Sequence, residues 1–204
     1  MKNTELEIKY LFGKKDIKKI KKAIENIDGI LKTGRFYEKT VMFDNKSKIM
    51  DNEDARLRVR EISKTKKNTK ICIEFSYKKR VRANGGIKKE EEIELSFEEN
   101  PGDLHKILYK MGFVPITSYE RHRETYKTDE NDIKITIDEF PFGYILEIEG
   151  NEKNIKSYNN KLKLNIKDSY PLSCDDVYVE LCQRYGVTPK DNILFDDSEM
   201  PQIK

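Results

Sequence analysis

Charged and apolar residues alternate along six separated segments of the chain. These segments are residues 5–10, 56–60, 88–94, 121–123, 134–138 and 147–149. Because side chains of a strand point alternately to the two faces of a sheet, each segment is predicted to be a strand with one charged and one apolar face. A half-buried strand with its charged face in water shows the same alternation, so one strand alone does not say which face points inward.

The six charged faces taken together differ from ordinary solvent-exposed faces. Arginine pairs dominate two of the segments and carboxylate pairs dominate three, whereas solvent faces usually mix lysine, glutamate, asparagine, serine and threonine. Closing such strands into a barrel would give a lumen lined by charges of both signs, with an apolar exterior covered by helices. The pattern therefore favours an α+β fold, an antiparallel β-barrel with helices packed outside.

Helical periodicity appears between the predicted strands. A stripe of four isoleucines predicts a helix over residues 17–27, with Asp16 as its N-cap. Asp103 is predicted to cap a second helix, which carries apolar residues at helical spacing. Further helices are expected near residues 152 to 163 and 175 to 185. These helices would cover the apolar outside of the barrel.

Turn residues and the polar C-terminus define the predicted organisation of the chain. Asn84-Gly85-Gly86 predicts a hairpin between a basic and an acidic strand, because Asn and Gly tolerate positive φ. Pro141 and Gly143 mark another turn. No internal repeat or linker is present, so we predict one domain over residues 1–186 and a polar tail over residues 187–204 that packs peripherally or frays.

Composition agrees with one folded domain. Charged residues make up 38% of the 204 residues and hydrophobic residues 36%, which alone would be compatible with disorder. Disorder, however, requires unbalanced charge and few aromatic residues. Here 40 basic and 37 acidic residues leave a net charge of only +3, and the chain has 11 Tyr and 9 Phe. A chain of this length can also bury a substantial core.

Cysteine spacing and hydropathy bear on the cellular location. Cys72, Cys174 and Cys182 are an odd number and widely spaced, so neither a disulfide framework nor a zinc site is indicated. No apolar run approaches ~20 residues, and the N-terminus opens directly into a predicted strand. The sequence therefore predicts a cytoplasmic protein without a membrane partner.

Short motifs follow one another in a fixed order between residues 5 and 149. They are Glu5-x-Glu7-x-Lys9, Leu57-Arg58-Val59-Arg60, Tyr77-Lys78, Glu91-Glu92-Ile93-Glu94, Arg121-x-Arg123-x-x-Tyr126, Ile137-Asp138-Glu139 before Gly143, and Glu147-Ile148-Glu149. This order resembles the CYTH domain, also called the triphosphate tunnel metalloenzyme family, which includes class IV adenylyl cyclases, thiamine triphosphatases and inorganic triphosphatases. The resemblance implies a closed antiparallel eight-stranded β-barrel that forms a tunnel.

The resemblance assigns divalent metal binding to two carboxylate pairs. These are Glu5 with Glu7 and Glu147 with Glu149, which would offer hard oxygen ligands to Mg²⁺ or Mn²⁺. Three further acids have the strand parity to face the tunnel, namely Glu90, Glu92 and Glu94. Glu91 interrupts their alternation, and a solvent-exposed acidic strand explains the run equally well.

The basic residues suit a triphosphate, whose charge has to be neutralised by several cations. Arginine grips phosphate oxygens through two parallel hydrogen bonds, whereas lysine acts as a point charge. The predicted substrate-binding residues are Arg58, Arg60, Arg121 and Arg123, with Lys9, Lys78 and Lys134. Lys9 and Asp138 are the candidate catalytic residues. For Asp138, a metal-bridging or base role competes with the simpler role of balancing a nearby arginine.

Strand parity assigns other notable side chains to structural roles. His122 lies between two arginines that are predicted to point inward, so it should point outward. His105 is expected on a helix surface, and Tyr126 shares the parity of His122, which favours packing. Arg80 and Arg82 continue the parity of Lys78 towards the hairpin, where they either guide the substrate or are exposed.

The resemblance leaves the reaction open. In class IV cyclases the ribose 3′-hydroxyl attacks the α-phosphorus, whereas in triphosphatases water attacks a terminal phosphorus. Since no nucleoside or thiazolium pocket can be located in the sequence, metal-dependent hydrolysis of tripolyphosphate, a nucleoside triphosphate or thiamine triphosphate is the preferred prediction. Class IV adenylyl cyclase activity is the close alternative.

Two alternatives from other classes are also considered. A module that binds polyphosphate without turnover is one, but the complete metal-ligand pairs argue against it. Nucleic-acid binding is disfavoured, because the net charge is small and no aromatic residues interleave the lysines of the first predicted helix. A homodimer formed through the helical exterior is an option that the sequence leaves open.

Overall fold

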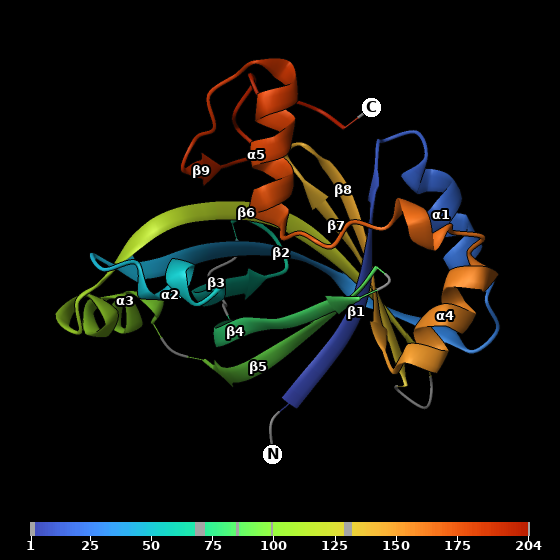
Figure 1. Cartoon of the computed structure of the whole chain (residues 1–204), viewed down its shortest axis with the longest axis horizontal. Helices are drawn as coiled ribbons and strands as arrows, with labels where there is room; N and C mark the ends of the chain where they lie inside the picture. Colours follow the sequence, from blue (N-terminus) through green and yellow to red (C-terminus); the bar gives the residue numbers. More distant parts are fainter. Residues whose placement is uncertain (1–2, 68–71, 85, 99, 129–131, 204) are drawn as a thin grey trace.

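The computed structural model describes residues 3–67, 72–84, 86–98, 100–128 and 132–203 (Figure 1). The strands in these ranges are β1 (Asn3–Phe12), β2 (Ile30–Asn45), β3 (Ala55–Ser63), β4 (Cys72–Asn84), β5 (Ile87–Phe97), β6 (Phe113–Thr128), β7 (Ile133–Phe140), β8 (Gly143–Gly150) and β9 (Asn192–Ile193). The helices are α1 (Ile17–Glu25), α2 (Ile49–Asn52), α3 (Pro101–Lys110), α4 (Glu152–Lys161), α5 (Cys174–Tyr185) and a 3₁₀ turn over Ile166–Asp168.

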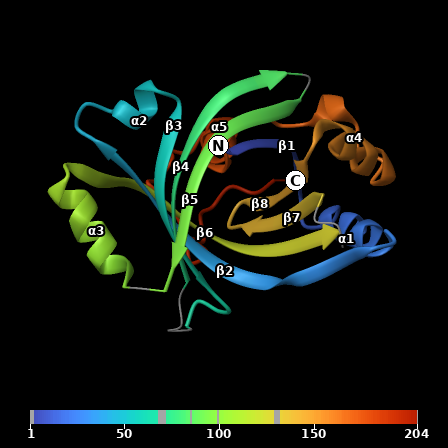
Figure 2. The ribbon, with the colours of Figure 1, turned by 90° about the horizontal axis from the view of Figure 1, so that it is seen from below.

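The eight long strands form a closed antiparallel barrel. Their order is β2-β3-β4-β5-β1-β8-β7-β6, and β6 returns to pair with β2 along nearly its whole length. Figure 2 shows the barrel from below, with β2 and β6 side by side and β4 and β5 on the opposite wall. This architecture confirms the predicted α+β fold with an eight-stranded barrel and external helices.

Outward-facing apolar residues of the barrel pack beneath helices. The outward side chains Ile8 and Tyr10 of β1 are 1% and 3% exposed and join a cluster with Ile17 and Ile24 of α1 and Ile155 of α4. On the other side of the barrel, α2 and α3 cover part of β2, β3 and β4, as Figure 1 shows. The apolar faces therefore look outward to the helices, which leaves the charged faces for the lumen.

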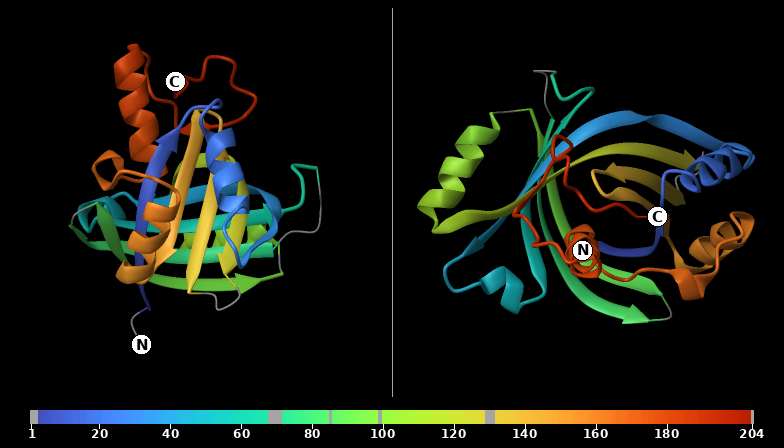
Figure 3. Two further views of the ribbon diagram at one scale, coloured as in Figure 1. Left: turned by 90° about the vertical axis from the view of Figure 1, so that its right-hand side faces the viewer. Right: turned by 90° about the horizontal axis from the view of Figure 1, so that it is seen from above.

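The helix α5 and the C-terminal segment cover one end of the barrel. Val177, Tyr178 and Leu181 of α5 are buried in a cluster with Tyr119 of β6 and Ile145 of β8. Figure 3 shows α5 and the C-terminal segment on the same side of the barrel. This apolar cluster holds α5 against the end of the barrel.

The C-terminal segment packs closely against the barrel. In β9, Asn192 and Ile193 pair in parallel with Ser118 and Tyr119 of β6, and Ile193 is 1% exposed. Further on, the Ile203 amide donates a hydrogen bond to the Phe142 carbonyl at 2.8 Å. Of the two expectations for the tail, the described residues follow packing, whereas Lys204 lies outside them. The division at residue 186 stays a prediction.

Helix starts differ in detail from the sequence predictions. Asp16 does precede α1, but it makes no capping hydrogen bond; its carboxylate contacts the Lys19 ammonium at 3.2 Å. Asp103 as the cap of α3 is wrong, because Asn100 takes that place and accepts a hydrogen bond from the Gly102 amide. Pro101 then occupies the first helical position, where its missing N–H costs nothing.

Both later helices agree with the predictions. Helix α4 follows its predicted range closely, and α5 begins one residue before the predicted start. Ser173 caps α5 through a reciprocal capping box with Asp176. Gly186 ends the helix with a left-handed φ of 66°, a conformation that glycine adopts without steric cost.

The hairpin between β4 and β5 forms where Asn84-Gly85-Gly86 predicts it. Asn84 pairs with Ile87, whereas Gly85 lies outside the described residues. The pairing shifts register between Arg80 and Arg82, so the parity expected from Lys78 does not continue through this part of the strand. Arg80 instead contacts Asp54 at 3.4 Å, next to the start of β3.

No helix in the described part of the chain is long and apolar enough to cross a membrane.

Candidate active site

The lumen of the barrel contains a cavity of about 550 Å³ with a largely charged lining. Every one of the eight barrel strands contributes to this lining, and the N-terminal end of α5 adds Ser173, Cys174 and Asp175. Acidic residues come mainly from β1, β5 and β8, and arginines come from β3 and β6. The inner faces thus place an acidic wall and a basic wall in one space.

Nearly all sequence-predicted site residues line this cavity. They are Glu5, Glu7, Lys9, Arg58, Arg60, Lys78, Glu90, Glu92, Glu94, Arg121, Arg123, Lys134, Glu147 and Glu149. Asp138 is the exception, because it lies behind the lining with its side chain 1% exposed. The three further acids of β5 differ in exposure: Glu90 is 2% exposed, Glu92 is half-buried, and Glu94 is exposed.

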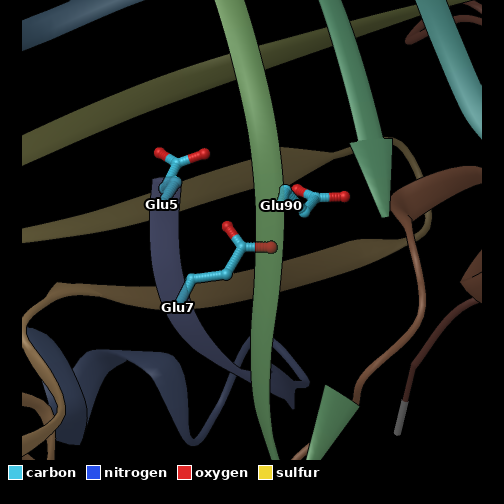
Figure 4. Close-up of side chains that lie close together, drawn as sticks. All are labelled: Glu5, Glu7 and Glu90. Atoms are coloured by element: carbon cyan, nitrogen blue, oxygen red, sulfur yellow. The ribbon is translucent and has the colours of Figure 1, made fainter. Parts of the chain in front are cut away.

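Three carboxylates converge at one place on the acidic wall. Glu5 and Glu7 extend from β1, and Glu90 lies opposite Glu5 on β5, as Figure 4 shows. One oxygen from each residue lies within 4.8 Å of the others. Several carboxylate oxygens at this spacing suit Mg²⁺ or Mn²⁺, which prefer hard oxygen ligands. The donor set therefore fits the metal that the family resemblance implies.

Lysines neutralise the same cluster. The Lys78 ammonium lies 2.6 Å from Glu5, and the Lys88 ammonium lies 2.6 Å from Glu90. Lys9 contacts Glu7 at 2.7 Å. Because each buried carboxylate has a cationic partner, the acidic cluster avoids the cost of uncompensated buried charge.

Glu147 and Glu149, the second predicted metal-binding pair, contact different basic residues. Glu147 contacts Arg123 at 3.0 Å and Lys9 at 3.3 Å. Burial raises the pKa of Glu147, but the charges of Lys9 and Arg123 more than offset this and hold it well below the usual range. Glu149 contacts Lys134 at 2.5 Å and hydrogen-bonds to Glu5. Neither belongs to the three-carboxylate cluster, so their metal-binding role stays a prediction.

Glu149 gives a testable dependence of stability on pH. Burial raises its pKa from 4.5 to about 7, with a further contribution from the Glu5 charge that Lys134 opposes. At a pH between these two pKa values, Glu149 holds a proton in the folded protein but has released it in the unfolded chain. The free energy of unfolding should therefore fall as the pH rises through this window. Glu149→Gln should remove this contribution.

Urea unfolding of the wild type and Glu149→Gln at about pH 5 and about pH 8 would measure the effect. The variant should gain stability relative to the wild type at the higher pH. The pKa values of His105 and His122 are lowered by burial, which gives the opposite slope, but both proteins share this contribution and it cancels in the difference. Parallel pH curves for the two proteins would contradict the prediction.

The basic wall is built on buried acids. Arg121 donates to Glu38 at 2.6 Å and to Asp138 at 2.8 Å. Arg123 binds both oxygens of Asp138, each at 2.6 Å. Such bidentate pairs fix the plane of a guanidinium. The acids beneath the wall therefore orient two arginines towards the cavity.

Arg58 and Arg60 extend the basic wall along β3. Arg58 donates through Nε to the Ser76 hydroxyl at 2.7 Å, and its nearest carboxylate, Glu92, is 3.4 Å away. Arg60 contacts Glu74 at 2.7 Å. Arg58 is thus held by a neutral partner, which leaves its charge less neutralised than that of the other arginines.

Glu38 is a site residue that sequence reasoning missed. It lies opposite Arg121 in the pairing of β2 with β6 and is 4% exposed. Burial raises its pKa, but Arg121 and Arg60 outweigh burial and hold it at about 2. The inner face of β2 otherwise carries Phe36, Thr40 and Met42, so it shows no charge alternation to notice.

Residues predicted to be structural lie outside the cavity. His122 packs edge-on against Tyr37 and Phe195, with ring centroids 5.6 and 4.9 Å away. Tyr126 is 1% exposed within the outer core, so both predictions are confirmed. His105 is half-buried against the Phe43 ring, so it is not the simple surface residue expected.

Comparison with known proteins supports the fold. No protein-family model matches the sequence, and no curated protein matches it. Solved structures do match. The PH1012 protein from Pyrococcus horikoshii OT3 superimposes with a TM-score of 0.64 and 25% identity, over 83% of this chain and 96% of that chain. A candidate adenylate cyclase from Vibrio parahaemolyticus gives a TM-score of 0.68 and 15% identity, over 87% and 98% of the two chains.

A plant protein adds a described activity. HpAC1 from Hippeastrum, named for adenylyl cyclase activity and described as having a dominant triphosphatase activity, matches with a TM-score of 0.62 and 18% identity over 91% of this chain and 97% of that chain. The barrel, the charged cavity inside it and the matching solved structures together define the class of protein. It is a closed barrel with a site of mixed charge in its lumen. The chain has the fold of the CYTH, or triphosphate tunnel metalloenzyme, family.

Proposed function

We propose that this protein is a divalent-metal-dependent enzyme that acts on triphosphates and hydrolyses a phosphoanhydride bond. The observation that carries the proposal is the pairing, inside one cavity, of an arginine-rich wall with a cluster of three carboxylates. A metal-bound triphosphate needs both kinds of group at once. The triphosphatase activity described for HpAC1, which shares the fold, agrees with this choice.

In this proposal the basic wall binds the phosphoryl groups. Arg58, Arg60, Arg121 and Arg123 supply guanidinium groups, and Lys78 and Lys134 add point charges. Because Arg60 and Arg121 are only 5% and 4% exposed, their charges act in a medium of lower effective dielectric than water, which strengthens their effect on charge that develops during the reaction. The acids beneath Arg121 and Arg123 keep the wall in place before the substrate arrives.

The carboxylate cluster would hold Mg²⁺ or Mn²⁺. Glu5, Glu7 and Glu90 are the proposed ligands, with Glu147 and Glu149 as neighbours that are predicted to assist. A bound metal supplies Lewis-acid polarisation of phosphoryl oxygens.

The two candidate catalytic residues receive different roles. Contacts with Glu7 and Glu147 outweigh burial and raise the pKa of Lys9, so Lys9 stays protonated. It therefore suits stabilisation of negative charge and not proton abstraction. Asp138 has both oxygens engaged by arginines, so its proposed role is to position Arg121 and Arg123.

Adenylyl cyclase activity is the second candidate. The candidate adenylate cyclase from Vibrio parahaemolyticus has the same fold, and one cavity of this chemistry could bind the triphosphate for either reaction. A non-catalytic polyphosphate-binding module is the third candidate, which metal-dependent turnover by the purified protein would exclude. The free cysteines agree with a cytoplasmic location.

Product analysis would test the proposal. The purified protein would be incubated separately with tripolyphosphate, ATP and thiamine triphosphate, each with Mg²⁺, with Mn²⁺ and with a chelator. Metal-dependent release of orthophosphate is the expected result. Cyclic AMP and pyrophosphate from ATP would instead establish the cyclase, and absence of any turnover would favour the binding module.

A further inference from the structure

Two apolar side chains interrupt the charged lining at one end of the cavity. Phe36 of β2 and Ile62 of β3 both line it. Ile62 pairs with Glu38, so Phe36, two residues before Glu38 on the same face, is its diagonal neighbour across the two strands. We call these two side chains the platform. The other apolar residues of the lining, Met42, Tyr119, Phe140 and Ile145, belong to the cluster that contains Val177 of α5.

This platform lies at the end of the cavity remote from α5. Phe36 and Met42 lie on the same face of β2, six residues apart, which corresponds to ~20 Å along a strand. Met42 belongs to the apolar cluster that contains Val177 of α5, whereas Phe36 does not. The first turn of α5 also contributes Ser173 and Cys174 to the lining. The α5 helix and its apolar cluster therefore lie at one end of the cavity, and Phe36 lies towards the other end.

Backbone geometry presents the Phe36 ring to this space. Gly34 lies at a shift in the pairing of β2 with β6 and has a φ of 141°. A Cβ at Gly34 would lie 3.0 Å from the Phe36 ring, so the ring packs directly over the glycine backbone. Phe36 is nevertheless 37% exposed. The ring is thus supported from its own strand while part of its surface stays accessible.

Polar groups surround the platform at the same end. Thr125 lies opposite Gly34, and Lys127 lies opposite Lys134, which in turn pairs with Glu149. Thr125 and Lys127 of β6 and Lys134 of β7 thus bring hydroxyl and ammonium groups to the lining. An aromatic surface with nearby hydroxyls and cations matches a planar base with an attached sugar phosphate.

We propose that Phe36 and Ile62 form a platform for the base of a nucleoside triphosphate, whose triphosphate extends from there towards α5 along the arginine wall. This assignment rests on the proposed function and adds the substrate class. Aromatic rings stack on nucleic-acid bases whatever the base, because every base has a π face. Bare tripolyphosphate has no group that could occupy the platform.

The test is the preference for ATP over tripolyphosphate. We would measure kcat/KM for both substrates with Mn²⁺ in the wild type, Phe36→Ala and Phe36→Tyr. Phe36→Ala should lower the ratio of the two kcat/KM values on the order of tenfold, mainly through the KM for ATP. Phe36→Tyr keeps the ring and should keep the ratio near that of the wild type. Tyr109→Ala, an exposed aromatic residue on α3, is the matched control.

The possible results separate this inference from the proposed function. An unchanged ratio in Phe36→Ala, or an equal loss for both substrates, would overturn the platform while leaving triphosphate hydrolysis in place. If the wild type turns over neither substrate, the proposed function fails. Calorimetric titration with ATP and with tripolyphosphate in Mg²⁺ then decides the platform: selective loss of ATP affinity in Phe36→Ala supports it, and equal affinities in the two proteins refute it.

Discussion

Replacing Glu7 by Gln should lower metal-dependent turnover by on the order of a hundredfold or more, with the fold retained. Glu7 is one of the three converging carboxylates and is 4% exposed. The substitution preserves the shape of the side chain but removes a charged oxygen ligand. Lys9 and Lys88, at 2.7 and 3.5 Å from Glu7, would at the same time lose part of their neutralisation. Both effects disfavour a bound cation.

Steady-state rates measured across a range of Mn²⁺ concentrations would show this loss as a higher metal requirement. Direct binding of Mn²⁺, followed by electron paramagnetic resonance, should weaken in parallel. Glu152→Gln is the matched control, because Glu152 lies on the exposed surface of α4 and contacts only Lys156 among the ion pairs of the described residues. Normal turnover with an unchanged metal requirement in Glu7→Gln would mean that the cluster does not hold the metal.

Replacing Asp138 by Ala should destabilise the protein by about 3–5 kcal/mol. Its carboxylate is 1% exposed and accepts hydrogen bonds from both Arg121 and Arg123. Removing it leaves the buried guanidinium of Arg121 and the half-buried one of Arg123 without their common partner, although Glu38 and Glu147 still contact them. Among the hydrogen bonds of the described residues, Glu38 accepts from Arg121 and Glu147 from Arg123, whereas Asp138 accepts from both arginines.

The midpoint of urea unfolding measures this prediction, and Asp16→Ala supplies the control. Asp16 is exposed and pairs only with Lys19 among the described residues, so its loss should leave the midpoint nearly unchanged. A role as a catalytic base would give the opposite pattern for Asp138→Ala: strongly reduced turnover with normal stability. That pattern would refute the positioning role.

Most of the fold could be predicted because charged and apolar residues alternate along most of its strands. Segments such as Glu5–Lys9 and Arg56–Arg60 place charges on the lumen side and apolar residues on the helix side. Strand β2 gives no such signal, yet it closes the barrel. Its role follows only from pairing with β3 and β6, which no local pattern encodes.

The sequence predicts which residues line the cavity, but it does not predict which of them contact one another. Parity alone places Glu90, Glu92 and Glu94 on one face. In the structure Glu90 lies opposite Glu5 of β1 and is buried, whereas Glu94 lies beyond the described pairing of β1 with β5 and is exposed. Partners across strands, such as Glu38 for Arg121, depend on register. The Phe36 platform likewise needs the irregular backbone at Gly34, which a sequence pattern does not show.

The pairing of β2 with β6 has a consequence for how the chain folds. It joins Ile30 to Thr128 and carries the Glu38–Arg121 ion pair at the seam. Forming contacts between residues so far apart in sequence costs chain entropy, because a long loop has to be closed. Proteins dominated by such contacts fold slowly. Until this seam closes, the arginines of β6 face no buried acid from β2. Closure of this seam therefore completes the basic wall by adding Glu38, whereas the carboxylate cluster of β1 and β5 and the Asp138 contacts of β6 do not depend on it.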